Sequence, residues 1–259
     1  MDRRNFLCKS AFTMAGCFLG VNSTSKLFAC ETPRGVSMFT PKIALIIDDI
    51  GNSRSRTRQF LDLDIPITFS VLPRLVHSCS LAIEIHKQGH EIMLHQPMEP
   101  HNSRLDPGPG ALYVGDKSKT ITRIIESNIS DVPYAIGVNN HMGSRFTERQ
   151  HEMTDTLKVV KRNDLFFIDS LTSNHSQAFE TAKKLHVTAA RRNVFLDNTR
   201  SKSAILYQLE KLMKQSRKYG YAIGIGHPFS ETAKAIGDFF QYDRNQNISL
   251  VHISEILKM

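Results

Sequence analysis

The chain of 259 residues lacks several features that would place it in a large class of proteins. No apolar run reaches the roughly 18 residues that a membrane-spanning helix needs, which excludes a multi-span membrane protein. Four cysteines are too few for a disulfide scaffold of this length. Lysines and arginines form no run interleaved with aromatic residues, so we expect no nucleic-acid partner. Internal repeats and low-complexity tracts are also missing, which leaves an ordinary globular protein.

The net charge of +8 gives only partial information about partners. The first 30 residues carry +3 of it, which leaves +5 for residues 31–259. This balance is typical of a mildly basic soluble domain. It is also compatible with attraction to an anionic partner such as a cell-wall polymer or a membrane surface.

The first 30 residues resemble an export signal rather than part of a fold. Arg3 and Arg4 precede Phe6-Leu7 as in twin-arginine signals, and the apolar stretch 10–21 has the length of a signal core. We therefore predict a twin-arginine-type export signal over 1–30, a linker over 31–41 and one domain over 42–259. Cys17 or Cys30 leaves lipid attachment open as an alternative. The expected location is the periplasm or cell envelope, with membrane contact only through the signal or a lipid anchor.

From residue 42 onward, short apolar runs alternate with segments of helical spacing. Continuous apolar runs predict strands that are buried on both faces of a parallel sheet. Seven or eight such strand-then-helix units predict an α/β fold, a closed or nearly closed β/α barrel, with an open doubly wound sheet as the alternative. The residues 147–150 (TERQ) predict a capping box at the start of a helix. The predicted strands are 43–47, 67–72, 91–94, 134–138, 165–168, 187–190, 221–225 and 248–251.

Polar side chains follow the ends of five of these strands. They are Asp48 and Asp49, His95, residues 139–141 (NNH), residues 169–170 (DS), and His227. The carboxyl ends of parallel strands meet at one face of a β/α fold, where active sites are built. We therefore expect these side chains to share one site.

The residue types in this set point to metal-assisted hydrolysis. Two imidazoles and one carboxylate leave open positions on an ion, which is the arrangement of a catalytic metal site. In the pair Asp48 and Asp49, one carboxylate can bind the ion while the other accepts a proton from water. A more distant histidine can protonate the leaving group.

Six motifs in this order resemble those of the polysaccharide deacetylases, which are carbohydrate esterases with a NodB-like fold. The similarity is greatest to the divergent polysaccharide deacetylase branch and extends over about residues 42–256. The motifs are 46–51 (IIDDIG), 89–95 (GHEIMLH), 95–100 (HQPMEP), 139–144 (NNHMGS), 169–170 (DS) and 226–228 (GHP).

The resemblance implies a deformed (β/α)7-8 barrel that removes acyl groups from a carbohydrate polymer or oligosaccharide, with a divalent metal, most simply Zn²⁺. By position, Asp48 would be the general base, Asp49 and His95 metal ligands, and His227 the general acid.

The chain departs from the family pattern at two motifs. Glu99 stands where ordinary members have a second ligand histidine, and the arginine-containing third motif is replaced by the segment that carries His141. We therefore expect His141 to be the third ligand, with Glu99 as an alternative ligand or a partner of one. Asp169 would orient a ligand or the acid histidine. Substrate contacts are expected from Arg145, Asn140 and Ser170.

Three functions follow from this pattern. The first is an exported metal-dependent carbohydrate deacetylase. The second is a barrel that has lost turnover and acts as an envelope polysaccharide-binding or scaffold protein, which the altered motifs favour. A weaker third possibility is a metal-dependent amidase acting on a peptide or another small amide.

Overall fold

The computed structural model describes residues 40–242 and 247–258. The predicted export signal (1–30) and nearly all of the predicted linker (31–41) therefore lie outside the described residues. In chain order the elements are β1 (Lys42–Ile50), α2 (Arg54–Leu61), β2 (Thr68–Val71), α3 (Ser78–Lys87), β3 (Glu91–Met98), α4 (Ser118–Asp131), β4 (Ala135–Met142), η1 (Phe146–Glu148), α5 (Gln150–Arg162), β5 (Phe166–Asp169), α6 (Ala178–Lys184), β6 (Ala189–Arg191), β7 (Val194–Phe195), α7 (Lys202–Tyr219), β8 (Tyr221–Gly226), α8 (Ser230–Tyr242), β9 (Ser249–Val251) and α9 (Ile253–Leu257).

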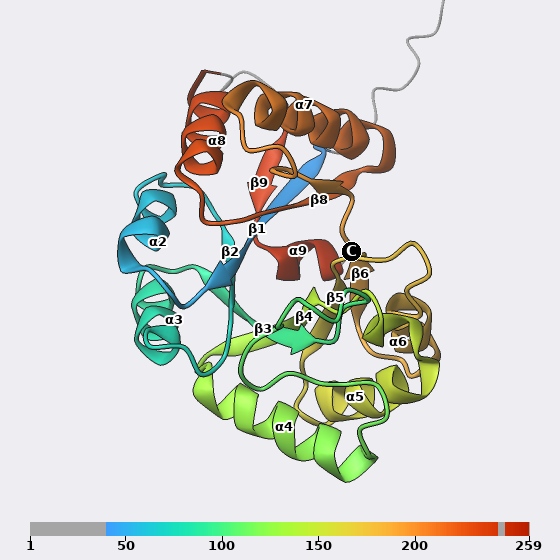
Figure 1. Cartoon of the computed structure of the whole chain (residues 1–259). Helices are drawn as coiled ribbons and strands as arrows, with labels where there is room; N and C mark the ends of the chain where they lie inside the picture. The colour runs from blue at the N-terminus through green and yellow to red at the C-terminus, as the bar shows by residue number, and fades with distance from the viewer. Residues whose placement is uncertain (1–39, 243–246, 259) are drawn as a thin grey trace, which may run out of the picture. The chain divides into compact units, whose positions relative to one another are not determined.

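The strands form one parallel sheet in the order β6-β5-β4-β3-β2-β1-β8-β7, with β9 beside the first residues of β1. The sheet curls, with helices around its outside (Figure 1). Within the described residues no strand pairing joins β6 to β7, so the curled sheet stays open on one side. The deformed β/α barrel predicted from the sequence is confirmed.

The alternation of side chains along β1 builds two hydrophobic cores. Ile43, Leu45 and Ile47 belong to the outer core, which the surrounding helices cover. Ala44 and Ile46 face the inside of the curl. There they pack with residues of α9, which lies in the middle of the curled sheet (Figure 1). Because both faces of the sheet are covered, the strands read as continuous apolar runs in the sequence.

One prediction of local structure is wrong. Thr147 does not cap a helix, because its hydroxyl and its backbone N–H both donate to the carbonyl of Gly143, at 2.9 Å each. The residues 146–148 form a single 3₁₀ turn instead, and α5 begins only at Gln150, without a side-chain cap. The same hydroxyl serves a local turn rather than the following helix.

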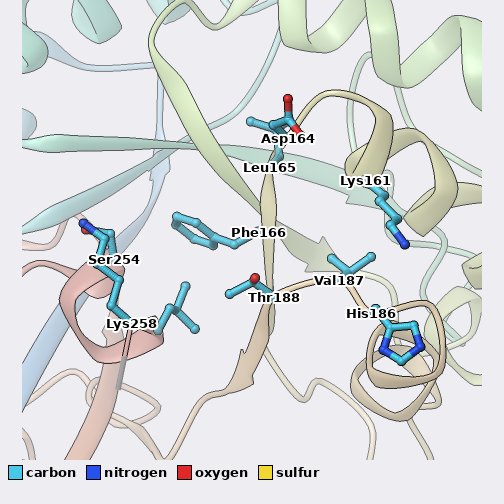
Figure 2. A pocket seen from close by; sticks show the side chains of 10 residues that line it. Lys161, Asp164, Leu165, Phe166, His186, Val187, Thr188, Ser254 and Lys258 are labelled. Atoms are coloured by element: carbon cyan, nitrogen blue, oxygen red, sulfur yellow. The ribbon is translucent and has the colours of Figure 1, made fainter.

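A cavity of about 420 Å³ lies at the amino ends of β5 and β6, beside α9 (Figure 2). Phe166, Val187 and Leu257 contribute apolar surface to it. Since the polar residues at the strand ends lie at the carboxyl ends, this cavity is separate from them. Among the helices that the structure describes, none is long and apolar enough to cross a membrane.

Candidate metal centre

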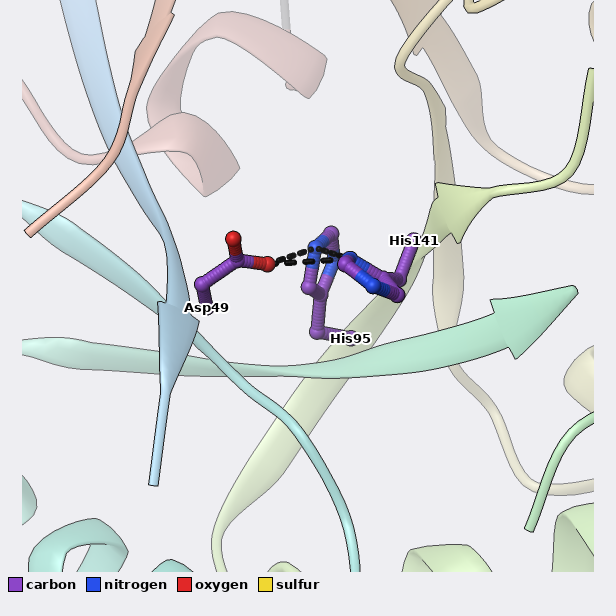
Figure 3. A group of neighbouring side chains, drawn as sticks. All are labelled: Asp49, His95 and His141. Atoms are coloured by element: carbon purple, nitrogen blue, oxygen red, sulfur yellow. Dashed lines mark hydrogen bonds and ion pairs between the residues drawn. The ribbon is translucent and has the colours of Figure 1, made fainter. Parts of the chain in front are cut away.

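The carboxyl ends of β1, β3 and β4 bring together Asp49, His95 and His141 (Figure 3). Asp49 Oδ1 lies 3.1 Å from His95 Nε2 and 2.9 Å from His141 Nδ1. The two ring nitrogens are 3.1 Å apart. The three side chains predicted as metal ligands thus meet at one point, and their role as ligands stays a prediction.

An irregularity in β1 places its two aspartates. The pairing of β1 with β2 shifts register between Ile47 and Ile50, and Asp49 has a φ of 58°. Residues other than glycine rarely adopt a positive φ, and such strain is retained where neighbouring structure enforces it. In a regular strand Asp48 and Asp49 would point to opposite faces. Here both carboxylates approach His95 Nε2, at 3.6 Å for Asp48 and 3.1 Å for Asp49.

Asn139 connects His95 to Asp48 through its side-chain amide. Its Nδ2 donates to Asp48 Oδ1 at 2.8 Å and to Ser170 Oγ at 3.2 Å. Its Oδ1 accepts a hydrogen bond from Ser70 Oγ and lies 2.7 Å from His95 Nδ1. A carboxylate accepts hydrogen bonds, so the amide nitrogen of Asn139 faces Asp48 and its amide oxygen faces His95. Because that oxygen can only accept, neutral His95 carries its proton on Nδ1. Nε2 is then left with a lone pair that points at the cluster.

Burial and charge separate the two aspartates. Burial raises the pKa of Asp48, and His95 and His227 only partly offset that effect. Burial also acts to raise the pKa of Asp49, but the adjacent ring nitrogens of His141 and His95 outweigh it and hold that pKa well below its usual range. Asp49 therefore stays ionised, as a ligand must. Asp48 has the raised pKa that suits a proton acceptor.

The donor set fits a divalent cation. Asp49 Oδ1 is buried and has no hydrogen bond of good geometry, although two ring nitrogens are close to it. Around an ion at about 2.0–2.1 Å, neighbouring ligand atoms are about 3.3 Å apart in a tetrahedron and about 2.9 Å apart in an octahedron. The three separations here are 2.9, 3.1 and 3.1 Å. Burial lowers the pKa of His95, but Asp48 and Asp49 raise it above its usual value, so the local field favours a positive charge.

His227 stands at the edge of this cluster at the end of β8. Its Nε2 lies 3.9 Å from Asp49 Oδ2, and its Nδ1 lies 2.8 Å from Asp197 Oδ1. Burial lowers the pKa of His227, but the hydrogen bond and charge of Asp197 dominate and raise it to about 9. The imidazole is therefore protonated at neutral pH, as a general acid must be before it acts.

The predicted alternative ligand Glu99 lies outside the cluster. Its carboxylate pairs with Arg145 at 2.6 Å and accepts from the backbone N–H of Val114 at 2.7 Å. Arg145, predicted to contact substrate, is thus held by Glu99, although its side chain keeps 43% of its surface exposed. Both residues fix the segment between β3 and α4 against the segment after β4.

The other predicted residues are buried. Asn140 is 1% exposed, and its amide bonds to the carbonyl of Met142 and the N–H of Ser170. Ser170 is 2% exposed and accepts from Asn139. The described bonds of Asp169 come from the Leu171 N–H and from the hydroxyl of Ser176, not from a ligand or the acid histidine. These three residues support the strand ends and present almost no surface to a substrate.

Sequence reasoning missed the roles of two residues. Asn139 stands in the quoted motif at the end of β4, but its link between His95 and Asp48 depends on side-chain positions. Asp197 follows the short strand β7, and its buried carboxylate orients His227. An aspartate two residues after a strand is the signal that would have found it, had β7 been predicted.

Comparisons with known proteins identify the family of the chain and a relative. The family model described as divergent polysaccharide deacetylase matches residues 45–257. The uncharacterized protein YibQ of Escherichia coli K12 is 34% identical over 216 residues, which are 83% of this chain and 67% of that protein.

Two solved structures are similar in fold. The crystal structure of the uncharacterized protein ATU2773 from Agrobacterium tumefaciens superimposes with a TM-score of 0.80 at 24% identity, over 85% of this chain and 90% of that one. A variant of BA3943, a CE4 family pseudoenzyme from Bacillus anthracis, gives a TM-score of 0.50 at 15% identity, over 84% of this chain and 67% of that one. Since the family model spans nearly the whole described domain, the chain belongs to the divergent polysaccharide deacetylase family.

Proposed function

We propose that this protein is an exported, metal-dependent hydrolase that removes acyl groups from a cell-envelope or other carbohydrate. The observation that carries the proposal is the triangle of Asp49, His95 and His141, with Asp48 and His227 beside it. Family membership supports a carbohydrate polymer as the substrate. Two imidazoles and a carboxylate support Zn²⁺, because this ion binds nitrogen and oxygen ligands and leaves a position open in catalytic sites.

The side chains of the site divide the chemistry between them. Asp49, His95 and His141 would hold the ion, and a bound divalent cation supplies polarisation of the acyl carbonyl. Asp48, held at Oδ1 by Asn139, accepts a proton from the attacking water through its other oxygen. His227, kept protonated by Asp197, donates a proton to the departing nitrogen or oxygen of the sugar.

Export is the part of the proposal that rests on residues 1–30. The paired arginines followed by a short apolar stretch support a twin-arginine-type signal and a periplasmic or envelope location. Export would place the enzyme in the compartment where envelope carbohydrates are exposed. Fusing residues 1–41 to a reporter that is active only after export tests this part. Replacing Arg3 and Arg4 by lysine should abolish the reporter signal.

A second candidate is a carbohydrate-binding protein of the same fold without turnover. The observation that favours it is Glu99, which occupies the position of an expected ligand histidine and is paired with Arg145 instead. This candidate predicts stoichiometric binding of oligosaccharide with no acetate release under any divalent metal.

Acetate release from N-acetylated and O-acetylated oligosaccharides, after chelation and reloading with single divalent metals, distinguishes the two candidates. We expect release by the wild-type protein, and a loss of at least about 100-fold in Asp48→Asn with the metal still bound. Asp164→Asn is the matched control, because Asp164 is exposed at the opposite end of β5 and its positive φ suits asparagine. No release with zinc, manganese, cobalt or nickel would overturn the hydrolase proposal.

A further inference from the structure

A row of flat side chains flanks the proposed acid His227. Phe195 stacks on its ring at 5.2 Å between centroids, and the tilted ring of Phe229 lies 5.7 Å from it. The guanidinium of Arg192 lies 4.5 Å from the Phe195 centroid, and that of Arg200 lies 3.8 Å from the Phe229 centroid. Each of the two rings that contact His227 thus carries an arginine.

Arg192 is held in place by the backbone. Its Nε donates to the carbonyl of Ser170 at 2.7 Å, and its Nη2 donates to the carbonyl of Leu171 at 3.0 Å. Of the five N–H donors of a guanidinium, the remaining ones have no partner among the described residues. Asp169 and Asp48 are close enough to act on its charge, but no carboxylate of the described residues lies within ion-pair distance. A partly buried cation that is positioned but unpaired is prepared to receive an anion.

A small cavity of about 140 Å³ opens beside Asp49, next to the residues that follow His227. Arg56 and Phe229 line it, together with the segment that leads into α2. Arg200 stacks on the same Phe229 ring. The volume is below the 300 Å³ or so of a typical small-molecule pocket, so it suits a substituent rather than a whole sugar chain.

We call Arg56, Arg192 and Arg200 the rim arginines. Arg56 lies in the first turn of α2, and Arg192 and Arg200 lie in the segments after β6 and β7. None of the three makes an ion pair within residues 40–242 or 247–258. Nearby arginines behave differently, because Arg54 pairs with Glu84 and Arg191 pairs with Glu180. Charges that the chain leaves unpaired around one site create a positive potential there.

We propose that the rim arginines bind an acidic group of the substrate, so that the substrate is a glycan carrying carboxylate or phosphate near the acyl group. This inference rests on the proposed function and narrows its substrate class. The net charge of +5 over residues 31–259 is compatible with this inference. A guanidinium binds both carboxylate and phosphate through paired N–H groups, so both anions are candidates.

Binding to three matched oligosaccharides tests the proposal. The probes are a neutral N-acetylglucosamine oligomer, the same oligomer with a lactyl carboxylate on alternate sugars, and the same oligomer with phosphate esters. Calorimetry on metal-loaded Asp48→Asn protein measures their dissociation constants without turnover. We expect one of the acidic oligomers to bind at least about tenfold more tightly than the neutral one at about 20 mM salt, and the difference to shrink at about 200 mM. The tighter acidic probe identifies the anion.

Substitutions test whether the rim arginines cause the preference for acidic oligomers. Arg56→Gln and Arg200→Gln should each weaken binding of the acidic oligomer about three- to tenfold and binding of the neutral oligomer less than twofold. Neither guanidinium makes a hydrogen bond to the described chain, so both variants should fold. Arg192→Gln should have the largest effect, and Arg192→Lys should restore it only in part, because lysine lacks the planar fork. Arg123→Gln removes an exposed arginine of α4 and is the charge-matched control.

Equal dissociation constants for the neutral and acidic oligomers would overturn the acidic-substrate proposal. Arginine variants that weaken the binding of all three probes equally would also overturn it. No binding of any probe at millimolar concentration would overturn it as well. Acetate release by wild-type protein separates this failure from that of the proposed function. Equal release from neutral and acidic oligomers would refute only the substrate class. An acidic preference in binding without any release would refute only the hydrolase.

Discussion

Removing the charge of Asp197 should lower the pKa of His227 by about two pH units or more. Asp197 is buried, and its Oδ1 lies 2.8 Å from His227 Nδ1. Its Oδ2 accepts from the backbone N–H of His227 at 2.6 Å and from the hydroxyl of Thr232 at 2.8 Å. Asp197→Asn keeps the shape of the side chain and an acceptor for Nδ1–H, and it removes the negative charge.

The size of the expected pKa change follows from burial and from the charges around the His227 ring. Burial lowers the pKa of His227, Asp197 raises it most, and Asp49 and Asp48 add smaller contributions, which together bring it from 6.5 to about 9. At about 1.4 kcal/mol per pH unit, this elevation corresponds to about 3 kcal/mol. A raised pKa stabilises the folded protein fully below pH 6.5, and this stabilisation disappears as the pH rises through about 9. The folded protein should therefore lose stability as the pH rises between these two values.

NMR titration of the His227 imidazole in the metal-free protein measures the pKa directly. We expect a midpoint near 9 in the wild-type protein and near 6.5 or lower in Asp197→Asn. Urea unfolding at both ends of this pH range should show the loss of stability in the wild-type protein and little of it in the variant. Asp164→Asn should behave as wild type. A fall of less than one pH unit in Asp197→Asn would show that Asp48 and Asp49, not Asp197, raise the pKa of His227.

Three further substitutions test the site and the core. His141→Ala should weaken zinc binding at least about 100-fold in a competition titration, because a ligand is lost while the strand ends stay in place; unchanged affinity would remove His141 from the ligand set. Asn139→Ala should cost about 2–4 kcal/mol in urea unfolding, since several buried polar groups lose their partner; a cost below about 0.5 kcal/mol would contradict the network. Gly137→Ala should cost about 1–3 kcal/mol, because a Cβ there would lie 2.1 Å from the Phe166 ring; an unchanged melting temperature would show that the ring moves freely.

The sequence predicts the barrel well because buried parallel strands must be apolar on both faces. All eight predicted runs overlap observed strands, from 43–47 in β1 to 248–251 in β9. The strand β7 is missed because its two residues, Val194–Phe195, are too short to form a recognisable run. The opening between β6 and β7 is a property of strand pairing at the edges, which local patterns do not encode.

The candidate site is predictable in outline because strand ends converge. Asp49, His95 and His141 each follow the apolar part of a strand, so topology brings them to one rim, and the irregularity in β1 turns Asp49 toward the other two. Their supporting residues are not predictable in this way. Asn139 has its role only because its amide lies between His95 and Asp48, and Asp197 has its role only because β7 pairs with β8. Such contacts depend on rotamers and register rather than on residue type.

Asp49, His95 and His141 together should hold one divalent cation. X-ray absorption spectroscopy on the zinc-loaded protein, with the zinc content measured on the same sample, tests it most directly. We expect about one ion per chain, with two imidazoles and at least one oxygen bound directly to it. A protein that retains no zinc, or zinc whose spectrum shows no imidazole, would contradict it.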